Sequence, residues 1–331
     1  MALFGKKDKL QIISFQTYGT KSHLYLRGRA LEDEEIDLQE KGFLKLLQNT
    51  WKRFETDEIK NTPIKITLSD TVKVSGKTDN DGYYLIDETN DELANLTNSE
   101  GWLPFEISYT DTSLKREILH QNRFPGEMLI PSDRADYGVI SDIDDTILHT
   151  GVVSSLKWRV FINTVFKRAS ARKPLEGSAE LYHLLHRGAS GENANPIFYV
   201  SHSPWNLYRY LELFLQTNNF PKGPILLRDM ASFASKSEKP HKQHEIENIL
   251  KTYPNLSFIL FGDSGEKDAD IYIDIANQYP KQVKAIYLRS VADKKRMDRI
   301  HDLVLNFKLT PILVVNSSDE VITHAKTHGY I

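Results

Sequence analysis

The sequence predicts an α/β protein in which a β-sandwich domain precedes a domain with a doubly wound parallel sheet. The chain has 331 residues, more than the about 100 to 200 residues of a typical domain, which favours two compact units. Short segments that alternate apolar and polar residues fill its first part, whereas continuous apolar segments alternate with helical ones in its second part. We therefore expect a sandwich over residues 1–135 and an α/β domain over residues 136–331.

Strand patterns dominate the first part of the chain. Leu24–Gly28 and Ile64–Leu68 alternate apolar and polar residues with a period of two, which predicts strands with one buried face. One helix is expected over residues 38–54, where apolar residues recur at helical spacing. A turn at Asp81-Gly82 precedes a further strand and resembles the turn of transthyretin-like sandwiches.

The pattern changes near residue 135, after Pro125-Gly126 and Pro131 interrupt regular structure. Strands are then expected over residues 137–141, 196–201, 224–227, 256–261, 284–288 and 311–315. Helices are expected over residues 178–188, 204–217, 240–252, 267–279 and 295–306. Continuous apolar strands separated by helices are typical of a buried parallel sheet, which binds ligands at the carboxyl ends of its strands.

Composition excludes several classes of protein. A net charge of −3 and a pI near 6.4 provide no general attraction for nucleic acid, so we expect no nucleic-acid partner. The absence of cysteine excludes thiolate nucleophiles and cysteine-ligated metals. We expect no membrane-spanning segment and, because the N-terminus lacks a secretory pattern, a cytoplasmic location.

The first chemical motif is Asp142-Ile143-Asp144-Asp145-Thr146, directly after the first strand of the second part. Side chains two apart lie on one face of an extended chain, so Asp142 and Asp144 can share a site. Clustered carboxylates are costly to bury unless a cation neutralises them, and carboxylate oxygens suit Mg²⁺. The alternative is an Asp-rich turn that caps the next segment.

The second motif is Ser201-His202-Ser203-Pro204, at the end of an apolar strand and the expected start of a helix. The N-terminus of a helix attracts phosphate, and the hydroxyl of Ser201 is suited to bind a phosphoryl oxygen. Ser203 is equally suited to cap the helix. For His202, packing or orienting other groups is the favoured alternative to catalysis.

The third motif is His241-Lys242-Gln243-His244, a basic start to a helix. Cations are unusual at the positive end of the helix dipole, which indicates an anion opposite them. We select Lys242 as the cation that neutralises phosphate, against the alternative of a solvated lysine in a charged turn. His241 and His244 lack a second pair of ligands at zinc-binding spacing, so we assign them to the surface or to support of the site.

The fourth motif is Gly262-Asp263-Ser264-Gly265, followed by Asp268, where an apolar strand enters an acidic turn. Asp263 is placed to reach a metal. The two glycines permit close backbone approach. Asp268 lies near the start of the next helix, where it is suited either to a metal-bound water or to capping.

In this order, the motifs resemble the haloacid dehalogenase-like phosphatases. Asp142–Thr146, Ser201 with Ser203-Pro204, Arg228, Lys242 and Gly262–Asp268 look more closely like the catalytic domain of the yeast actin-patch-type phosphatidate phosphatases. The resemblance covers about residues 136–300. It implies a Mg²⁺-dependent phosphatase with a haloacid dehalogenase-like fold.

The resemblance also implies roles for individual residues. Asp142 is expected to attack phosphorus, and Asp144 to protonate the leaving group and then activate water. Thr146 is expected to orient the loop. The metal ligands expected are Asp142, the carbonyl of Asp144, Asp263 and Asp268, and the groups that bind substrate are expected to be Ser201, His202, Ser203, Arg228 and Lys242.

The substrate is less constrained than the chemistry. Residues 157–173 mix six basic residues with aromatic ones and contain no acidic residue, which is suited to an anionic lipid surface but equally to a helix packed on the core. Phosphatidate at a membrane surface is the favoured substrate. A soluble phosphomonoester or phosphoprotein, and a non-catalytic phosphate-binding or scaffold protein, stay open. So does a protein or membrane partner for the N-terminal domain.

Overall fold

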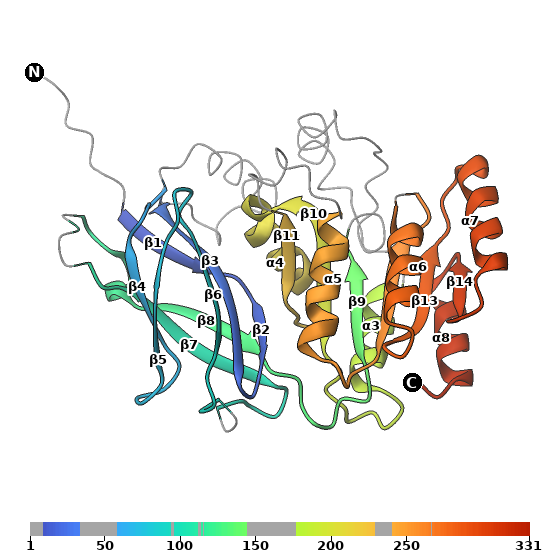
Figure 1. Cartoon of the computed structure of the whole chain (residues 1–331), viewed down its shortest axis with the longest axis horizontal. Helices are drawn as coiled ribbons and strands as arrows, with labels where there is room; N and C mark the ends of the chain where they lie inside the picture. Colours follow the sequence, from blue (N-terminus) through green and yellow to red (C-terminus); the bar gives the residue numbers. More distant parts are fainter. Residues whose placement is uncertain are drawn as a thin grey trace, which may run out of the picture. The chain divides into compact units, whose positions relative to one another are not determined.

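The computed structural model describes residues 9–33, 58–93, 96–111, 114, 116–143, 177–228, 240–265 and 267–331. The contacts between backbones divide the chain into two units, Met1–Pro131 and Ser132–Ile331. The expected helix at 38–54 lies outside the described residues. Figure 1 shows the strands of the first unit and the alternating strands and helices of the second.

The first unit contains an eight-stranded sheet in the order β1-β3-β2-β8-β7-β4-β5, with β6 paired to β3. All its pairings are antiparallel except that of β2 with β8. A single turn of 3-10 helix, η1 (Leu119–Asn122), precedes β8. The strands are β1 (Lys9–Ser14), β2 (Thr17–Thr20), β3 (His23–Asp33), β4 (Pro63–Thr67), β5 (Lys73–Lys77), β6 (Tyr83–Thr89), β7 (Trp102–Tyr109) and β8 (Phe124–Leu129).

Alternating burial confirms the β pattern expected for this unit. In β4, Ile64 and Ile66 are buried between more exposed residues, as a strand with one buried face requires. The expected turn is present: Gly82 has a φ of 75°, and the carboxylate of Asp79 accepts the N–H of Tyr83 at 2.9 Å. The sandwich arrangement of these strands stays a prediction.

The second unit contains a six-stranded parallel sheet and six α-helices among the described residues. Its strands are β9 (Gly138–Asp142), β10 (Ile197–Pro204), β11 (Ile225–Arg228), β12 (Phe258–Asp263), β13 (Val283–Arg289) and β14 (Ile312–Val315). Its helices are α3 (Ser178–Arg187), α4 (Tyr208–Thr217), α5 (His241–Thr252), α6 (Asp268–Gln278), α7 (Lys294–Asn306) and α8 (Ser318–Thr327), with a 3-10 turn η4 (Trp205–Leu207) before α4.

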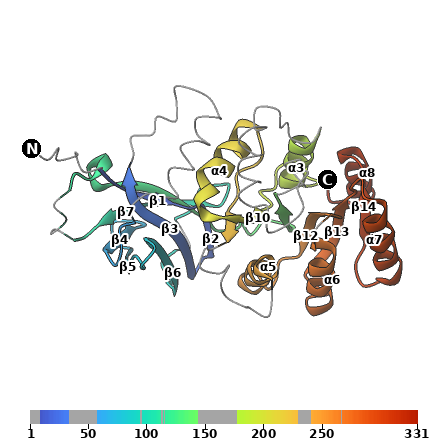
Figure 2. The ribbon, with the colours of Figure 1, turned by 90° about the horizontal axis from the view of Figure 1, so that it is seen from above.

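The strand order β11-β10-β9-β12-β13-β14 reverses direction between β9 and β12. Figure 2 shows α3 and α4 on one face of the sheet and α5 and α6 on the other. All residues of β9 and β12 are buried, because helices cover both faces. The reversal matters for function, since a crevice that binds ligands forms where neighbouring crossovers leave in opposite directions.

The predicted elements of this unit are present, with two differences. The strand expected to end at residue 201 continues to Pro204, and a 3-10 turn separates it from α4. Helix α8 was not expected. Every helix in the described ranges is too short or too polar to cross a bilayer.

Candidate active site

Strand register brings the predicted residues to one edge of the parallel sheet. Ser141 in β9 is paired with Phe261 in β12 and with Tyr199 in β10. The strands run in the same direction, so Asp142, Asp263 and Ser201 all follow at their carboxyl ends. This edge includes the point of strand reversal between β9 and β12.

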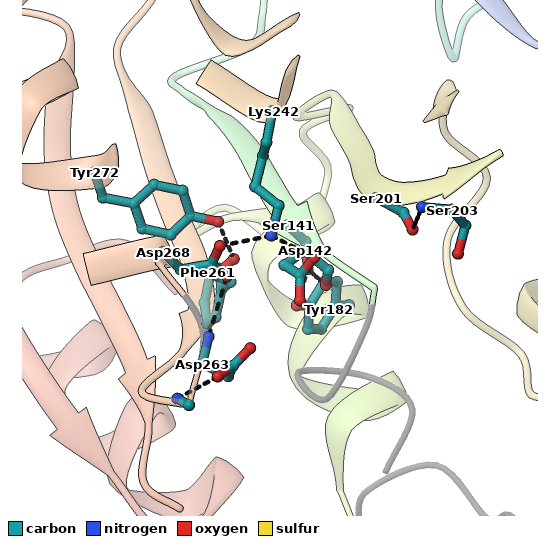
Figure 3. Close-up of polar contacts among 11 residues, drawn as sticks. Ser141, Asp142, Tyr182, Ser201, Ser203, Lys242, Phe261, Asp263, Asp268 and Tyr272 are labelled. Carbon is teal, nitrogen blue, oxygen red and sulfur yellow. Dashed lines mark hydrogen bonds and ion pairs between the residues drawn. The ribbon is translucent and has the colours of Figure 1, made fainter. Parts of the chain in front are cut away.

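Lys242 connects two of the carboxylates at this edge. It is the second residue of α5, and its side chain has no exposed surface. The ammonium Nζ donates to Asp142 Oδ1 at 2.8 Å and to Asp268 Oδ1 at 2.5 Å. Figure 3 shows Lys242 reaching between Asp142 and Asp268, with Asp263 beside them. The structure therefore joins residues that are 100 and 26 positions apart in the chain.

Three carboxylates at this edge fit a divalent cation. Asp142, Asp263 and Asp268 offer oxygens that all lie within 4.8 Å of one another, and all three side chains are fully buried. Their formal charge of about −3 exceeds the single positive charge of Lys242, and the remaining charge matches one divalent ion. Hard carboxylate oxygens are the ligands that Mg²⁺ prefers.

Asp268 lies at the first position of α6, where the helix dipole stabilises a carboxylate. Its Oδ2 accepts the backbone N–H of Asp263 at 3.3 Å. A Cβ atom on Gly262 would lie 2.5 Å from that same Oδ2 and 2.7 Å from Tyr272 Cε2. Gly262 therefore has a steric role, because a larger residue would push Asp268 out of place. The Tyr272 hydroxyl donates to the carbonyl of Phe261 at 2.8 Å.

Helix α3 supports the strand that carries Asp142. The hydroxyls of Tyr182 and Ser141 lie 2.5 Å apart, and Ser141 Oγ donates to the carbonyl of Asp142 at 2.8 Å. Burial raises the pKa of Tyr182 above the usual range of a phenol, so this hydroxyl stays protonated. The hydroxyls of Tyr182 and Ser141 therefore hold the end of β9, which carries Asp142, in place.

The predicted groups on β10 form a separate part of the edge. Ser201 and Ser203 are buried, and Ser201 Oγ accepts the N–H of Ser203 at 2.9 Å. Figure 3 shows both on the strand beside Asp142. Ser203 is not the expected helix cap, since Pro204 occupies the N-cap of η4. The strand continues past Ser203, which delays the start of the helix.

The pKa of His202 reflects the burial and the positive charges around the end of β10. Its pKa is lowered to about 3, first by burial and then by nearby positive charges, which belong to Lys242, His241, Arg228 and Lys267. Burial also lowers the pKa of Arg228 below its usual value. His202 is therefore neutral near pH 7, and the cations around it provide a field suited to an anion.

Some predicted residues lie outside the described part of the chain. Asp144, Thr146 and the basic segment 157–173 are among them. Of the two histidines assigned to the surface or to support, His244 is exposed. His241 Nε2 lies 4.0 Å from Glu245 Oε1, one turn further along α5.

Sequence reasoning missed two residues that contact this site. Tyr182 is one turn into α3 and follows the helical apolar pattern, so nothing in its spacing distinguishes it from a core residue. Arg296 donates from α7 to the carbonyl of Gly265, in the loop after Asp263. The sequence did contain a signal for the start of α7, because Asp293 is the N-cap of that helix and its side chain accepts the N–H of Arg296.

The fold and the site together define an α/β protein with a buried site of carboxylates and a lysine, suited to a divalent cation, at the carboxyl edge of a parallel sheet. Residues 137–290 match the family model described as "Phosphatidate phosphatase APP1, catalytic domain". The second unit of this chain belongs to that family.

Two relatives extend this similarity beyond the matched residues. Phosphatidate phosphatase APP1 of Saccharomyces cerevisiae is 33% identical over 262 residues, which cover 75% of this chain and 41% of that protein. An uncharacterized protein of Schizosaccharomyces pombe is 23% identical over 282 residues, which cover 82% of this chain and 41% of that protein. The chain thus spans about two fifths of the length of either relative.

One solved structure adds nothing to this assignment. The ferredoxin-NADP+ reductase of Plasmodium falciparum aligns at a TM-score of 0.15 and 10% identity over 93% of this chain and 94% of that one. A likeness of this size bears on neither fold nor function.

Proposed function

We propose that the chain is a Mg²⁺-dependent phosphatase of the haloacid dehalogenase-like class that hydrolyses phosphatidate to diacylglycerol and phosphate. The observation that carries the proposal is the buried contact of Lys242 with Asp142 and Asp268, beside Asp263. Membership of the phosphatidate phosphatase family supports the substrate. The accessory unit that precedes it is inferred to be a β-sandwich.

The proposed reaction has two steps. A carboxylate oxygen of Asp142 bonds to phosphorus while the bond to the leaving alkoxide breaks, and Asp144 gives that alkoxide a proton. Asp144 then takes a proton from water, whose oxygen bonds to phosphorus while the bond between phosphorus and Asp142 breaks, which releases phosphate and restores the Asp142 carboxylate. Lys242 orients the Asp142 carboxylate through Oδ1 at 2.8 Å and places a positive charge where phosphoryl oxygens gather.

Asp142, Asp263 and Asp268 would hold the cation, together with the carbonyl of Asp144. Bound Mg²⁺ would supply neutralisation of the charge that develops on the phosphoryl group. The remaining work falls to the protein. Ser201 and Lys242 bind phosphoryl oxygens, and Tyr182 and Ser141 hold the end of β9 in place.

The test is release of phosphate from phosphatidate in mixed micelles with Mg²⁺, beside a panel of soluble phosphoesters. Asp142→Asn is the matched control, since it keeps the size of the side chain and removes its nucleophilic charge. We expect lipid turnover that this substitution abolishes. Turnover of soluble esters alone would keep the chemistry and exclude the lipid. Binding of Mg²⁺ and phosphate without any turnover would favour a non-catalytic phosphate-binding protein.

Membrane contact is a separate part of the proposal. We infer that residues 157–173 bind anionic lipid, on the strength of the basic and aromatic residues in that segment. The cytoplasmic location stays a prediction. Reversal of the six basic charges in that segment should abolish sedimentation with anionic liposomes and leave turnover of soluble esters intact. Unchanged sedimentation would contradict the inference.

A further inference from the structure

The loop after β12 connects the two carboxylates Asp263 and Asp268, and its conformation decides where Asp263 points. The N–H of Gly265 donates to Asp263 Oδ1, and the N–H of Ser264 donates to the carbonyl of Arg289 at 2.9 Å. A Cβ atom on Gly265 would lie 3.0 Å from Asp263 Oδ1. Gly265 therefore lies against the carboxylate and fixes one of its oxygens.

Arg296, from α7, contacts the same loop at Gly265. Its Nη1 donates to the carbonyl of Gly265, while its Nε lies 3.3 Å from Asp293 Oδ2. Asp293 is itself fixed, because it caps α7 and its Oδ1 accepts the N–H of Arg296 at 3.2 Å. The guanidinium thus links the N-terminus of α7 to Gly265, whose amide contacts Asp263.

We propose that Arg296 is a positioning residue for the metal site, which acts by holding Gly265 so that Asp263 faces Asp142 and Asp268. The proposal rests on the proposed function for the identity of the cation. Arg296 lies beyond the residues matched by the family model, which end at 290. It would therefore be part of the site although the family match does not reach it.

Removal of the Arg296 side chain is expected to weaken metal binding through Gly265 and Asp263. Loss of the guanidinium removes a charge-assisted hydrogen bond to the carbonyl of Gly265 and leaves Gly265 with its amide contact to Asp263. Groups that orient metal ligands typically change metal affinity by about 10- to 100-fold when removed. We expect the lower end of that range, since Arg296 acts through one intervening residue.

The experiment measures direct binding of Mn²⁺, as a spectroscopic substitute for Mg²⁺, to the full chain by electron paramagnetic resonance. Arg296→Ala should raise the dissociation constant by about tenfold. In the phosphatase assay, the Mg²⁺ concentration at half-maximal rate should rise in parallel, whereas kcat at saturating Mg²⁺ should recover. Arg296→Lys should restore only part of the affinity for Mn²⁺. Lysine keeps the positive charge, but one ammonium cannot contact both Gly265 and Asp293 as the planar guanidinium does.

Arg299→Ala is the matched control on the same helix. Arg299 forms an ion pair with Asp270 at 2.5 Å, and its side chain is 53% exposed. Its loss removes a tie between α7 and α6 without touching the loop, so affinity for Mn²⁺ should not change. Circular dichroism confirms that each variant is folded at the assay temperature.

Wild-type affinity in Arg296→Ala would overturn the inference, and so would an equal loss in Arg299→Ala. Failure of the wild-type chain to bind Mn²⁺ would overturn it together with the metal of the proposed function. If the wild type binds Mn²⁺ but hydrolyses no phosphoester, the proposed function fails, and a tenfold weaker Arg296→Ala would still support the positioning role.

Discussion

Lys242 is the residue on which the site most depends. A lysine without exposed surface is costly unless its charge is balanced, and here two carboxylates balance it. The same contacts balance the charge of Lys242 and orient Asp142 for the proposed reaction. Without the ammonium, three carboxylates would face one another; with it, the charge that remains matches a divalent cation.

Lys242→Met should therefore affect both stability and activity. Removal of one partner from a buried ion pair typically costs about 3 to 5 kcal/mol in the free energy of unfolding, and urea unfolding in EDTA should show a loss of this order. Saturating Mg²⁺ should reduce that loss, because the ion neutralises the carboxylates left behind. Phosphate release should fall at least about 100-fold.

Lys251→Met provides the comparison for Lys242→Met. Lys251 lies on the same helix, its side chain is 63% exposed, and it pairs with Glu247 at 3.6 Å. The Glu247 carboxylate is buried but also accepts from Gln243 Nε2 at 3.4 Å, and the Lys251 ammonium is screened by solvent. Loss of Lys251 should therefore cost less stability than loss of Lys242, and turnover should remain close to that of the wild type. Equal losses in the two variants would show that burial of Lys242 is unimportant.

His202 predicts a dependence of stability on pH. Its pKa is lowered to about 3 in the folded protein by burial and nearby cations, from an ordinary value of 6.5. Between these values the unfolded chain binds a proton that the folded chain does not, so stability falls as the pH falls from 6.5 towards 3. His202→Asn should reduce this dependence in urea unfolding measured from pH 7.5 to 4.

The exposed His301 is the control for that measurement. His301→Asn should leave the difference in stability between pH 7.5 and 4 as it is in the wild type. If His202→Asn unfolds with the same pH dependence as the wild type, then His202 takes up its proton as easily in the folded chain as in the unfolded one.

Gly262 carries a steric prediction. In Gly262→Ala, the new methyl group would lie 2.5 Å from Asp268 Oδ2, so Asp268 or the loop must move. Overpacking of this kind typically costs about 1 to 3 kcal/mol, and binding of Mn²⁺ should weaken as well. Gly191→Ala is the comparison, since Gly191 has open space around it; its φ of 75° makes alanine strained, but Mn²⁺ binding should be unaffected.

At the scale of elements, helix α3 and strand β9 act as one support for Asp142. Tyr182→Phe removes the hydroxyl bonded to Ser141 but keeps the ring between Tyr199, Phe220 and Phe261. Loss of one buried hydrogen bond should cost about 1 kcal/mol, and turnover should fall modestly. A double-mutant cycle with Ser141→Ala checks the link: purely additive losses in unfolding free energy would contradict it.

The strands of the second unit were predictable because their burial on both faces leaves continuous apolar runs. Hydrophobic periodicity did not predict element boundaries that depend on tertiary contacts. β10 continues through Pro204, whose partner is Arg228 of β11; a proline at the expected start of a helix concealed this extension. Helix α8 was missed although Ser317 accepts the N–H of Glu320, the signal of a capping box.

The residues of the candidate site that lie at the ends of strands were predictable from the sequence. Asp142 and Asp263 each end an apolar strand, and parallel strands bring such residues together at one edge. Lys242 was selected from its unusual place at a helix start. Its contact with Asp268 and the support from Arg296 depend on how helices pack, which no local pattern records.

At the scale of the whole molecule, each unit has its own hydrophobic core. The first unit buries a cluster drawn from its strands and the loops beside them, including Leu26, Ile66 and Phe105. In the second, residues such as Ile140, Phe258 and Leu288 are fully buried. Every described residue of the carboxylate and lysine group lies in the second unit, so that unit contains the described part of the site.

Residues 132–331 should therefore fold without the first unit. The strand pairings of β9 to β14 lie within the range Ser132–Ile331, which also includes Asp142, Asp263 and Asp268, the carboxylates proposed to bind the metal, and Arg296. We expect this fragment to unfold cooperatively in urea and to bind Mn²⁺ with an affinity within about threefold of the full chain, a difference of less than about 0.7 kcal/mol. A fragment that is folded by circular dichroism but binds Mn²⁺ much more weakly would show that the first unit contributes to the metal site. An unfolded fragment would show that the second core is insufficient alone.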